Sequence, residues 1–118
     1  MATLKSRQIG SIAILTPKGY LTGGGETEEL EKAIKSLTEE GSKHLVINLS
    51  ETQHLNSTAL GVLIAAHTNY VRRGGQMKLC AVDKRIENIF VITKLSMVFD
   101  AYPTEEQAIA SFAERESV

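Results

Sequence analysis

The chain has 118 residues, of which 42% are hydrophobic and 23% are charged, and its formal net charge is -1. This length fits one compact domain, and the apolar content excludes an intrinsically disordered chain. A charge balance so close to neutral supplies no positive field for a phosphate backbone, so we expect no direct binding to nucleic acid.

Two short strands are predicted at the beginning of the chain. Apolar residues alternate within residues 9–17, which is typical of a half-buried strand that ends at Pro17. Residues 3–8 can pair with it, with Gly10 in the turn. We therefore expect an antiparallel pair of strands, followed by a glycine-rich loop over residues 19–25.

The middle of the chain alternates between helix and strand. Helical spacing of apolar residues predicts a helix from Glu26 to a stop at Gly41. The aliphatic run over residues 44–49 predicts a central strand that is covered on both faces. Residues 50–55 are predicted as a loop, and a second helix is predicted from about Ser57 to Arg73.

The last third of the chain continues this alternation. Residues 77–82 form a predicted strand in which Cys80 acts as a small buried hydrophobic residue. Asp83 opens the next predicted helix, a short strand is predicted around residues 98–100, and residues 103–106 begin the final helix. The inner face of that helix is expected to carry Ala108, Ile109 and Phe112.

This order of elements predicts an α/β fold with a mixed β-sheet of four to five strands and about four helices packed against it. No linker or repeat divides the chain, so we expect a single domain over residues 1–118, with a core of about residues 3–113. The longest uncharged apolar stretch, residues 59–66, is far shorter than the roughly 20 residues of a membrane span. The first residues lack a signal-peptide pattern, and we expect a cytoplasmic protein that is not bound to a membrane.

The helix that begins at Ser57 has two different faces. One face carries an apolar stripe that is expected to point toward the core, made of Leu60, Leu63, Ile64, His67, Tyr70 and Val71. The opposite face is uncharged and built largely from small residues, namely Thr58, Gly61, Val62, Ala65, Ala66 and Asn69. Small side chains let another backbone approach closely, so this face indicates either a partner protein or a neighbouring helix of the same domain.

The entrance of the same helix suits an anion. Asn56, Ser57 and Thr58 are residue types whose side-chain oxygens accept hydrogen bonds from the free N–H groups of a first turn. A phosphate at this position would meet the same donors and the positive end of the helix dipole. The simpler interpretation is a structural cap with no ligand.

Signals for catalysis are weak. The run Gly23–Gly25 lacks the following Lys-Ser or Lys-Thr of a P-loop, and Ser57 does not lie within Gly-x-Ser-x-Gly. The three histidines and Cys80 do not have the spacing of zinc ligands. We therefore expect a protein that is not an enzyme and that binds neither a metal nor a cofactor.

Several of these segments together resemble the STAS domain of the anti-sigma factor antagonist type, over about residues 3–113. The resemblance rests on the strand 45–49, the glycine pair 74–75, the strand 79–82 and the motif Asn56-Ser57-Thr58-Ala59-Leu60-Gly61. The typical motif in that family is Asp-Ser-Ser-Gly-Leu-Gly, so Asn56 replaces an Asp and Ala59 replaces a Gly. The loop over residues 19–25 also lacks the acidic residue that is common in the family.

The resemblance implies a partner-switching protein. Unphosphorylated, it would bind an anti-sigma factor that has serine/threonine kinase activity, which would release the sigma factor. Phosphorylation at Ser57, with Thr58 as the alternative, would inactivate it, and a serine phosphatase would reverse the change. We expect a monomer whose contact residues are Asn56, Ser57, Thr58, Gly61, Val62, Ala65 and Ala66.

A second hypothesis keeps the same fold without phosphorylation. In it the domain binds a small ligand or a nucleotide at the helix entrance, or it scaffolds a signalling complex.

Overall fold

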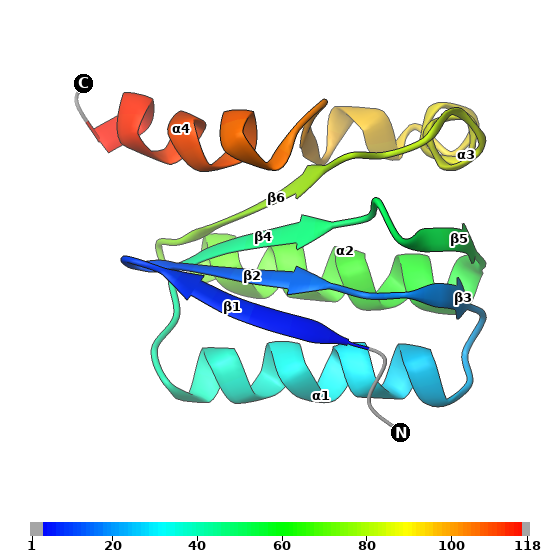
Figure 1. Cartoon of the computed structure of the whole chain (residues 1–118), viewed down its shortest axis with the longest axis horizontal. Helices are drawn as coiled ribbons and strands as arrows, with labels where there is room; N and C mark the ends of the chain where they lie inside the picture. Colours follow the sequence, from blue (N-terminus) through cyan, green and yellow to red (C-terminus); the bar gives the residue numbers. More distant parts are fainter. Residues whose placement is uncertain (1–3, 117–118) are drawn as a thin grey trace.

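A five-stranded mixed sheet forms the centre of the molecule, and the computed structural model describes residues 4–116 (Figure 1). Its strand order is β1-β2-β4-β6-β7, in which only β1 and β2 run antiparallel. The strands are β1 (Lys5–Ile9), β2 (Ile12–Thr16), β4 (His44–Asn48), β6 (Gln76–Cys80) and β7 (Asp100–Tyr102). The predicted antiparallel start, the central strand and the mixed sheet are therefore confirmed.

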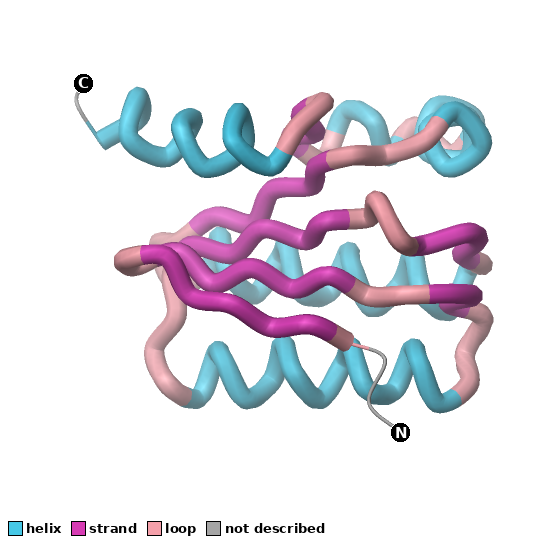
Figure 2. The backbone as a smooth tube through the Cα atoms, in the orientation of Figure 1, coloured by secondary structure: helices cyan, strands magenta, loops and turns pink. Residues whose placement is uncertain are grey.

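The helices lie on both faces of this sheet. In Figures 1 and 2, α1 and α2 lie on one side of the strands and α4 on the other. The helices are α1 (Gly25–Glu39), α2 (Ser57–Arg72), α3 (Lys84–Ile92) and α4 (Glu105–Glu116), with a 3₁₀ turn η1 (Leu95–Met97) after α3. Each connection between parallel strands contains a helix, as parallel pairing requires.

Alternation along the strands divides the core into two layers. Ala13 and Leu15 of β2 pack in the larger cluster with α1, α2 and α3, whereas Ile14 between them joins the smaller cluster under α4. Ala108 and Phe112 of α4 are buried in that smaller cluster and Ile109 packs against it, as predicted. Cys80 is buried there too, and burial raises the pKa of its thiol to about 12.

The α4 layer also contains a charged residue that the sequence pattern does not single out. Lys78 is 1% exposed, although it lies in the predicted strand over residues 77–82. Its Nζ donates to Ser111 Oγ at 2.6 Å and lies 4.6 Å from the centroid of the Phe112 ring. The hydroxyl and the aromatic face stabilise an ammonium group that would otherwise be costly to bury.

Two predictions about the strands are wrong. The predicted loops over residues 19–25 and 50–55 are not wholly loops, because β5 (Thr52–Leu55) pairs in parallel with β3 (Gly19–Leu21) in a second, two-stranded sheet. This pairing joins segments more than 30 residues apart, through contacts such as the Thr52 hydroxyl donating to the Pro17 carbonyl oxygen at 3.0 Å. Local patterns do not report such long-range pairing.

The last strand is also displaced from its predicted position. It covers Asp100–Tyr102 instead of residues around 98–100. Val98 has helical backbone angles at the end of η1, and Phe99 is only 5% exposed because it packs into the large core cluster. Phe99 therefore packs into the core before the strand begins, whereas Val98 is 41% exposed. No helix among residues 4–116 is long and apolar enough to cross a membrane.

Candidate functional site

The entrance of α2 is built where β5 ends. Leu55, the last residue of β5, is 1% exposed, and Asn56 follows it as the N-cap of α2. The side-chain oxygen of Asn56 accepts from the Ala59 N–H at 3.2 Å. Its side-chain amide donates to the Thr22 carbonyl oxygen at 2.9 Å, and its backbone N–H donates to the Leu21 carbonyl oxygen at 3.1 Å. Asn56 is therefore both the helix cap and a link to the loop after β3.

That loop lies directly against the first turn of α2. Gly23 has a φ of +96°, a conformation that residues other than glycine rarely adopt. A side chain there would also meet Thr58, whose methyl carbon lies 3.5 Å from the position that a Cβ would occupy. The Gly23 N–H donates to the hydroxyl of buried Thr27 at 2.9 Å, which ties the loop to α1. The loop after β3 therefore contacts the first turn of α2 and is hydrogen-bonded to α1.

The two predicted hydroxyl residues are accessible at this entrance. Ser57 and Thr58 are both exposed, and no described residue accepts a hydrogen bond from the backbone N–H of either. The first turn of α2 contains no acidic residue, whereas that of α1 contains Glu26 and Glu28. Free N–H groups and the positive end of the helix dipole make the α2 entrance favourable for a negative group on either hydroxyl.

The buried stripe of α2 is rotated from its predicted position. Leu60, Leu63 and Tyr70 are buried as expected, and His67 packs its ring edge against Phe99 at 5.5 Å. Ile64 and Val71, however, are 37% and 53% exposed. Ala59 and Ala66 take their place in the core cluster. The rotation arises because α1 packs beside α2 and covers one flank of the helix.

The uncharged face of α2 is consequently divided between the domain itself and the surface. Ala66 is 5% exposed, so its predicted place on an accessible face is wrong, and Val62 is half-buried. Both residues line a groove of about 210 Å³ between α1 and α2, together with Ile34, Thr38, Ala65 and Asn69. Thr58, Gly61 and Ala65 remain exposed. A neighbouring helix therefore covers half of this face and leaves the other half free.

The contact of the loop at Thr22 and Gly23 with the α2 entrance is not predicted from the sequence. The pattern predicts only a break in the chain there, whereas the hydrogen bond from Asn56 to Thr22 joins residues 34 positions apart. The only local signal is the run Gly23–Gly25, which is compatible with any flexible turn.

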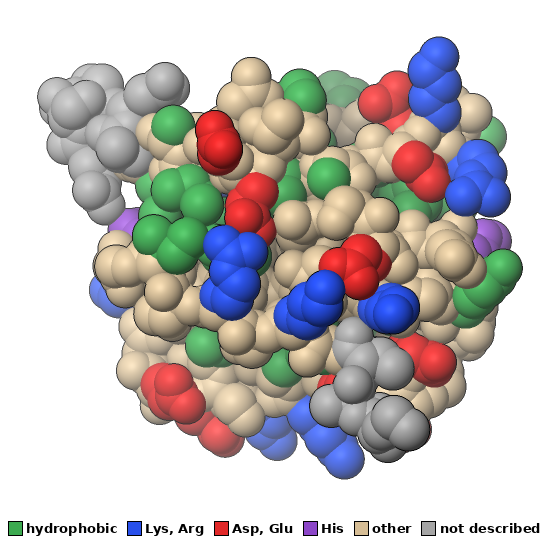
Figure 3. Space-filling view, viewed as in Figure 1, with side chains coloured by type: hydrophobic (Ala, Val, Ile, Leu, Met, Phe, Trp, Pro, Cys, Tyr) green, Lys and Arg blue, Asp and Glu red, His purple; other side chains and the backbone are tan. Residues whose placement is uncertain are grey.

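Charges elsewhere on the molecule are mixed. Figure 3 shows acidic and basic side chains interspersed on the face that carries β1. Four charged residues form two ion pairs that involve β1, Lys5 with Glu51 at 2.9 Å and Arg7 with Glu105 at 3.1 Å. This face therefore has no field of one sign that would attract a polyanion.

Comparisons with known proteins agree with this geometry. A family model described as the STAS domain matches residues 3–108. The anti-sigma F factor antagonist of Paenibacillus polymyxa is 25% identical over 67 residues, a match that spans 57% of this chain and 57% of that protein.

Solved structures share the fold. An anti-sigma factor antagonist from Mycobacterium paratuberculosis is similar with a TM-score of 0.81 and 23% identity, over 92% of each chain. Unphosphorylated SpoIIAA, an anti-sigma factor antagonist, is similar with a TM-score of 0.73 and 14% identity, over 93% of this chain and 97% of that one. The phosphorylated form of Bacillus SpoIIAA has a TM-score of 0.75 at 15% identity, over 92% and 98%.

Proposed function

This chain belongs to the STAS domain family, and we propose that it works as an anti-sigma factor antagonist, binding an anti-sigma factor and so releasing a sigma factor. The names of its relatives support this role, although the match to the Paenibacillus polymyxa protein covers just over half of each chain. One observation carries the proposal furthest. The exposed Ser57 hydroxyl lies at a capped helix entrance, directly beside an uncharged and partly open helix face.

The partner would dock on the open half of that face. Ser57, Thr58, Gly61 and Ala65 are exposed and carry no charge, so burying them costs less than burying charged side chains, provided that the two hydroxyls find hydrogen-bond partners. Val62 would contribute through the groove that it shares with α1. Ala66 is 5% exposed and belongs to the core cluster, so it would contribute little to such an interface.

Phosphorylation of Ser57 would switch this binding off. A phosphoserine adds a charge of about -1.5 to -2, which the free N–H groups of the first turn and the helix dipole tolerate in the isolated domain. In an interface formed around a neutral hydroxyl, the same charge would be desolvated without a partner. Ser57 is the preferred residue over Thr58 because one side of Thr58 lies against Gly23.

The chemistry of the switch would belong to the partners. A serine/threonine kinase activity in the anti-sigma factor would supply the nucleotide and the metal, and a serine phosphatase in the cytoplasm would remove the phosphate. The domain itself would act as substrate and ligand, so its task is to present Ser57 on a rigid helix end.

Titration calorimetry with the anti-sigma factor of the same organism tests the proposal. We expect Ser57→Asp to weaken binding by more than about tenfold while the thermal midpoint stays within a few degrees, since the new charge lies in the interface and not in the core. Ser36→Asp is the matched control, because Ser36 is an exposed serine of α1 that does not line the groove between α1 and α2. It adds the same charge to the surface away from the entrance.

Phosphopeptide mapping of the protein from its own cells locates the modified residue. Phosphate on Ser57 in the presence of the kinase supports the switch. Equal affinity of the wild type and Ser57→Asp for the anti-sigma factor would contradict it, as would equal weakening by Ser57→Asp and Ser36→Asp.

A further inference from the structure

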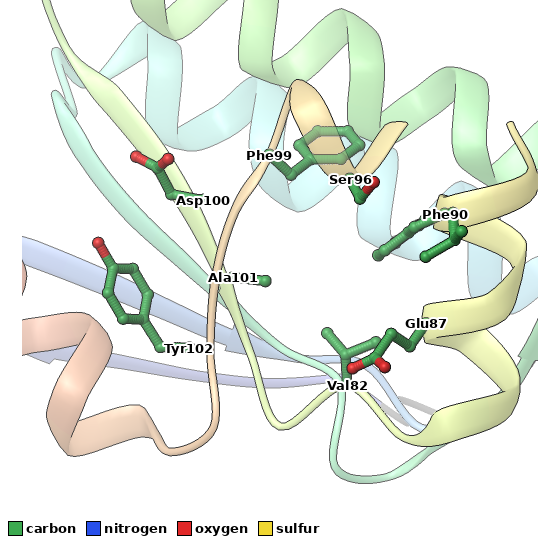
Figure 4. Close-up of a pocket in the computed structure, with 9 residues that line it drawn as sticks. Val82, Glu87, Phe90, Ser96, Phe99, Asp100, Ala101 and Tyr102 are labelled. Atoms are coloured by element: carbon green, nitrogen blue, oxygen red, sulfur yellow. The ribbon is translucent and has the colours of Figure 1, made fainter. Parts of the chain in front are cut away.

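A cavity of about 450 Å³ lies between α3, η1 and β7 (Figure 4). None of the residues that line it belongs to the α2 entrance. Its volume falls in the range of small-molecule sites, roughly 300–1,000 Å³. β7 is an edge strand, so no further strand lies beside it. Ala101 of β7 points toward the cavity (Figure 4). The cavity therefore has one strand wall and one helix wall.

The base of the cavity is aromatic. Phe90 of α3 is 3% exposed and Phe99 is 5% exposed, and their ring centroids are 5.7 Å apart. Both rings are held by the large core cluster, which fixes their orientation. Val82 completes the apolar lining at the end of β6, and Val91, which is 57% exposed, lies at the rim. This surface would bury the hydrocarbon or aromatic body of a ligand.

The charged side chains that line the cavity are all acidic. Glu87 extends from α3 toward Val82, on the same side of β7 as the two phenylalanine rings (Figure 4). Asp100 projects from the other side of β7 and contributes a second negative charge at the margin. No lysine or arginine is among the described residues that line the cavity.

We propose that this cavity binds a small organic cation, an ammonium or guanidinium group attached to an apolar body. The cation would meet the Glu87 carboxylate, which attracts positive charge. The apolar body would lie over Phe90, Phe99 and Val82. A phosphate or carboxylate ligand would instead be repelled by Glu87 and Asp100. This site is independent of the proposed partner switching.

Three probes that share a phenyl ring and carry a positive, a neutral or a negative polar group test the ligand class. Wild-type protein labelled with ¹⁵N is titrated separately with 2-phenylethylamine, 2-phenylethanol and phenylacetate, up to about 5 mM each, because fragments of this size bind weakly. We expect 2-phenylethylamine to bind with a Kd below about 1 mM and to shift the amide signals of Ser96 and Ala101. The neutral alcohol should bind at least about fivefold more weakly, and the anion should not bind.

Isosteric variants then test the residues. Glu87→Gln should weaken the binding of 2-phenylethylamine by at least about fivefold, and Asp100→Asn should weaken it less because its carboxylate lies on the other side of the strand. Glu39→Gln is the matched control, since Glu39 is an exposed glutamate at the far end of α1. All three changes lie at exposed positions, and unchanged spectra of the free variants show that the fold is retained.

The outcomes are decisive in either direction. Preference for the ammonium probe, shifts confined to the cavity and a loss with Glu87→Gln support the proposal. It is overturned if no probe binds, if the alcohol binds as tightly as the amine, if the shifts lie elsewhere, or if Glu87→Gln and Glu39→Gln behave alike.

Discussion

The two ends of α2 are held by different kinds of contact. At the N-terminal end, one side chain, Asn56, joins the helix to a glycine loop, and the neighbouring hydroxyls stay open to solvent. At the C-terminal end, the chain is pressed against the segment before β4. A Cβ on Gly75 would lie 2.3 Å from the Lys43 carbonyl oxygen, and the Tyr70 hydroxyl donates to Ser42 Oγ at 3.0 Å.

The N-terminal end of α2 is therefore the candidate functional site, whereas the contacts at its C-terminal end contribute to stability. The N-terminal end can accept a new group or a partner because little is packed over it. The C-terminal end cannot move without displacing the backbone of Lys43. Substitutions at the two ends should therefore differ in what they change as well as in how much.

The largest effect is expected at the C-terminal end of α2. Gly75→Ala should lower the free energy of unfolding by at least about 3 kcal/mol, because the new methyl group overlaps the Lys43 backbone and cannot rotate away. Urea denaturation measures the loss. Gly74→Ala is the matched control, since a Cβ at Gly74 meets open space and only its φ of +83° is strained. Its cost should be about 1–2 kcal/mol, and equal losses would contradict the close approach at Gly75.

An intermediate effect is expected at the N-terminal end of α2. Asn56→Ala removes both the cap and the bond to Thr22, and should cost about 1–2 kcal/mol in the same measurement. Asn56→Asp should cost less, because a carboxylate still caps Ala59 and favours the helix dipole but cannot donate to the Thr22 carbonyl.

This pair of variants also tests a reason for Asn56, which stands where the family resemblance implies an aspartate. Asparagine supplies an N–H donor that aspartate lacks, and the loop after β3 uses it. If Asn56→Asp proves not destabilising at all, the amide donor does not have this role, whereas a loss equal to that of Asn56→Ala would assign the whole cost to the donor.

The smallest effect concerns Tyr70 and pH. Burial raises the pKa of the Tyr70 hydroxyl above its ordinary value, so the folded state holds this proton more tightly than the unfolded state. The resulting stabilisation is complete below about pH 10, the unfolded pKa, and is lost as the pH rises through the folded pKa. Tyr70→Phe should lower stability at pH 7 by about 1 kcal/mol and should reduce the further loss between about pH 9 and pH 11.

Tyr20→Phe is the control for the loss of a tyrosine hydroxyl, because Tyr20 is 58% exposed. It should leave the stability at neutral pH unchanged. Identical alkaline curves for Tyr70→Phe and the wild type would show that the Tyr70 proton does not contribute.

Local patterns predicted most of the fold because they depend on periodicity and capping. The run over residues 44–49 is short and largely aliphatic, as expected of a central strand. Asp83 precedes a helical pattern and caps it by accepting from the Ile86 N–H at 2.9 Å. The entrance residues Asn56, Ser57 and Thr58 were predicted in the same way. Their residue types suit an N-cap in any fold, so no tertiary information was needed.

Tertiary structure alone decided which surfaces are free. The spacing in α2 predicted one apolar and one uncharged face, but the position of α1 exposed Ile64 and buried Ala66. Pairing between β3 and β5, the close approach at Gly75 and the cavity beside β7 likewise bring together residues distant in the chain. By itself the sequence determined the α/β fold, the resemblance to the STAS family and the capped hydroxyl site, since neighbouring residues specify them. Packing decided accessibility, because a side chain is exposed or buried only with respect to what lies across from it.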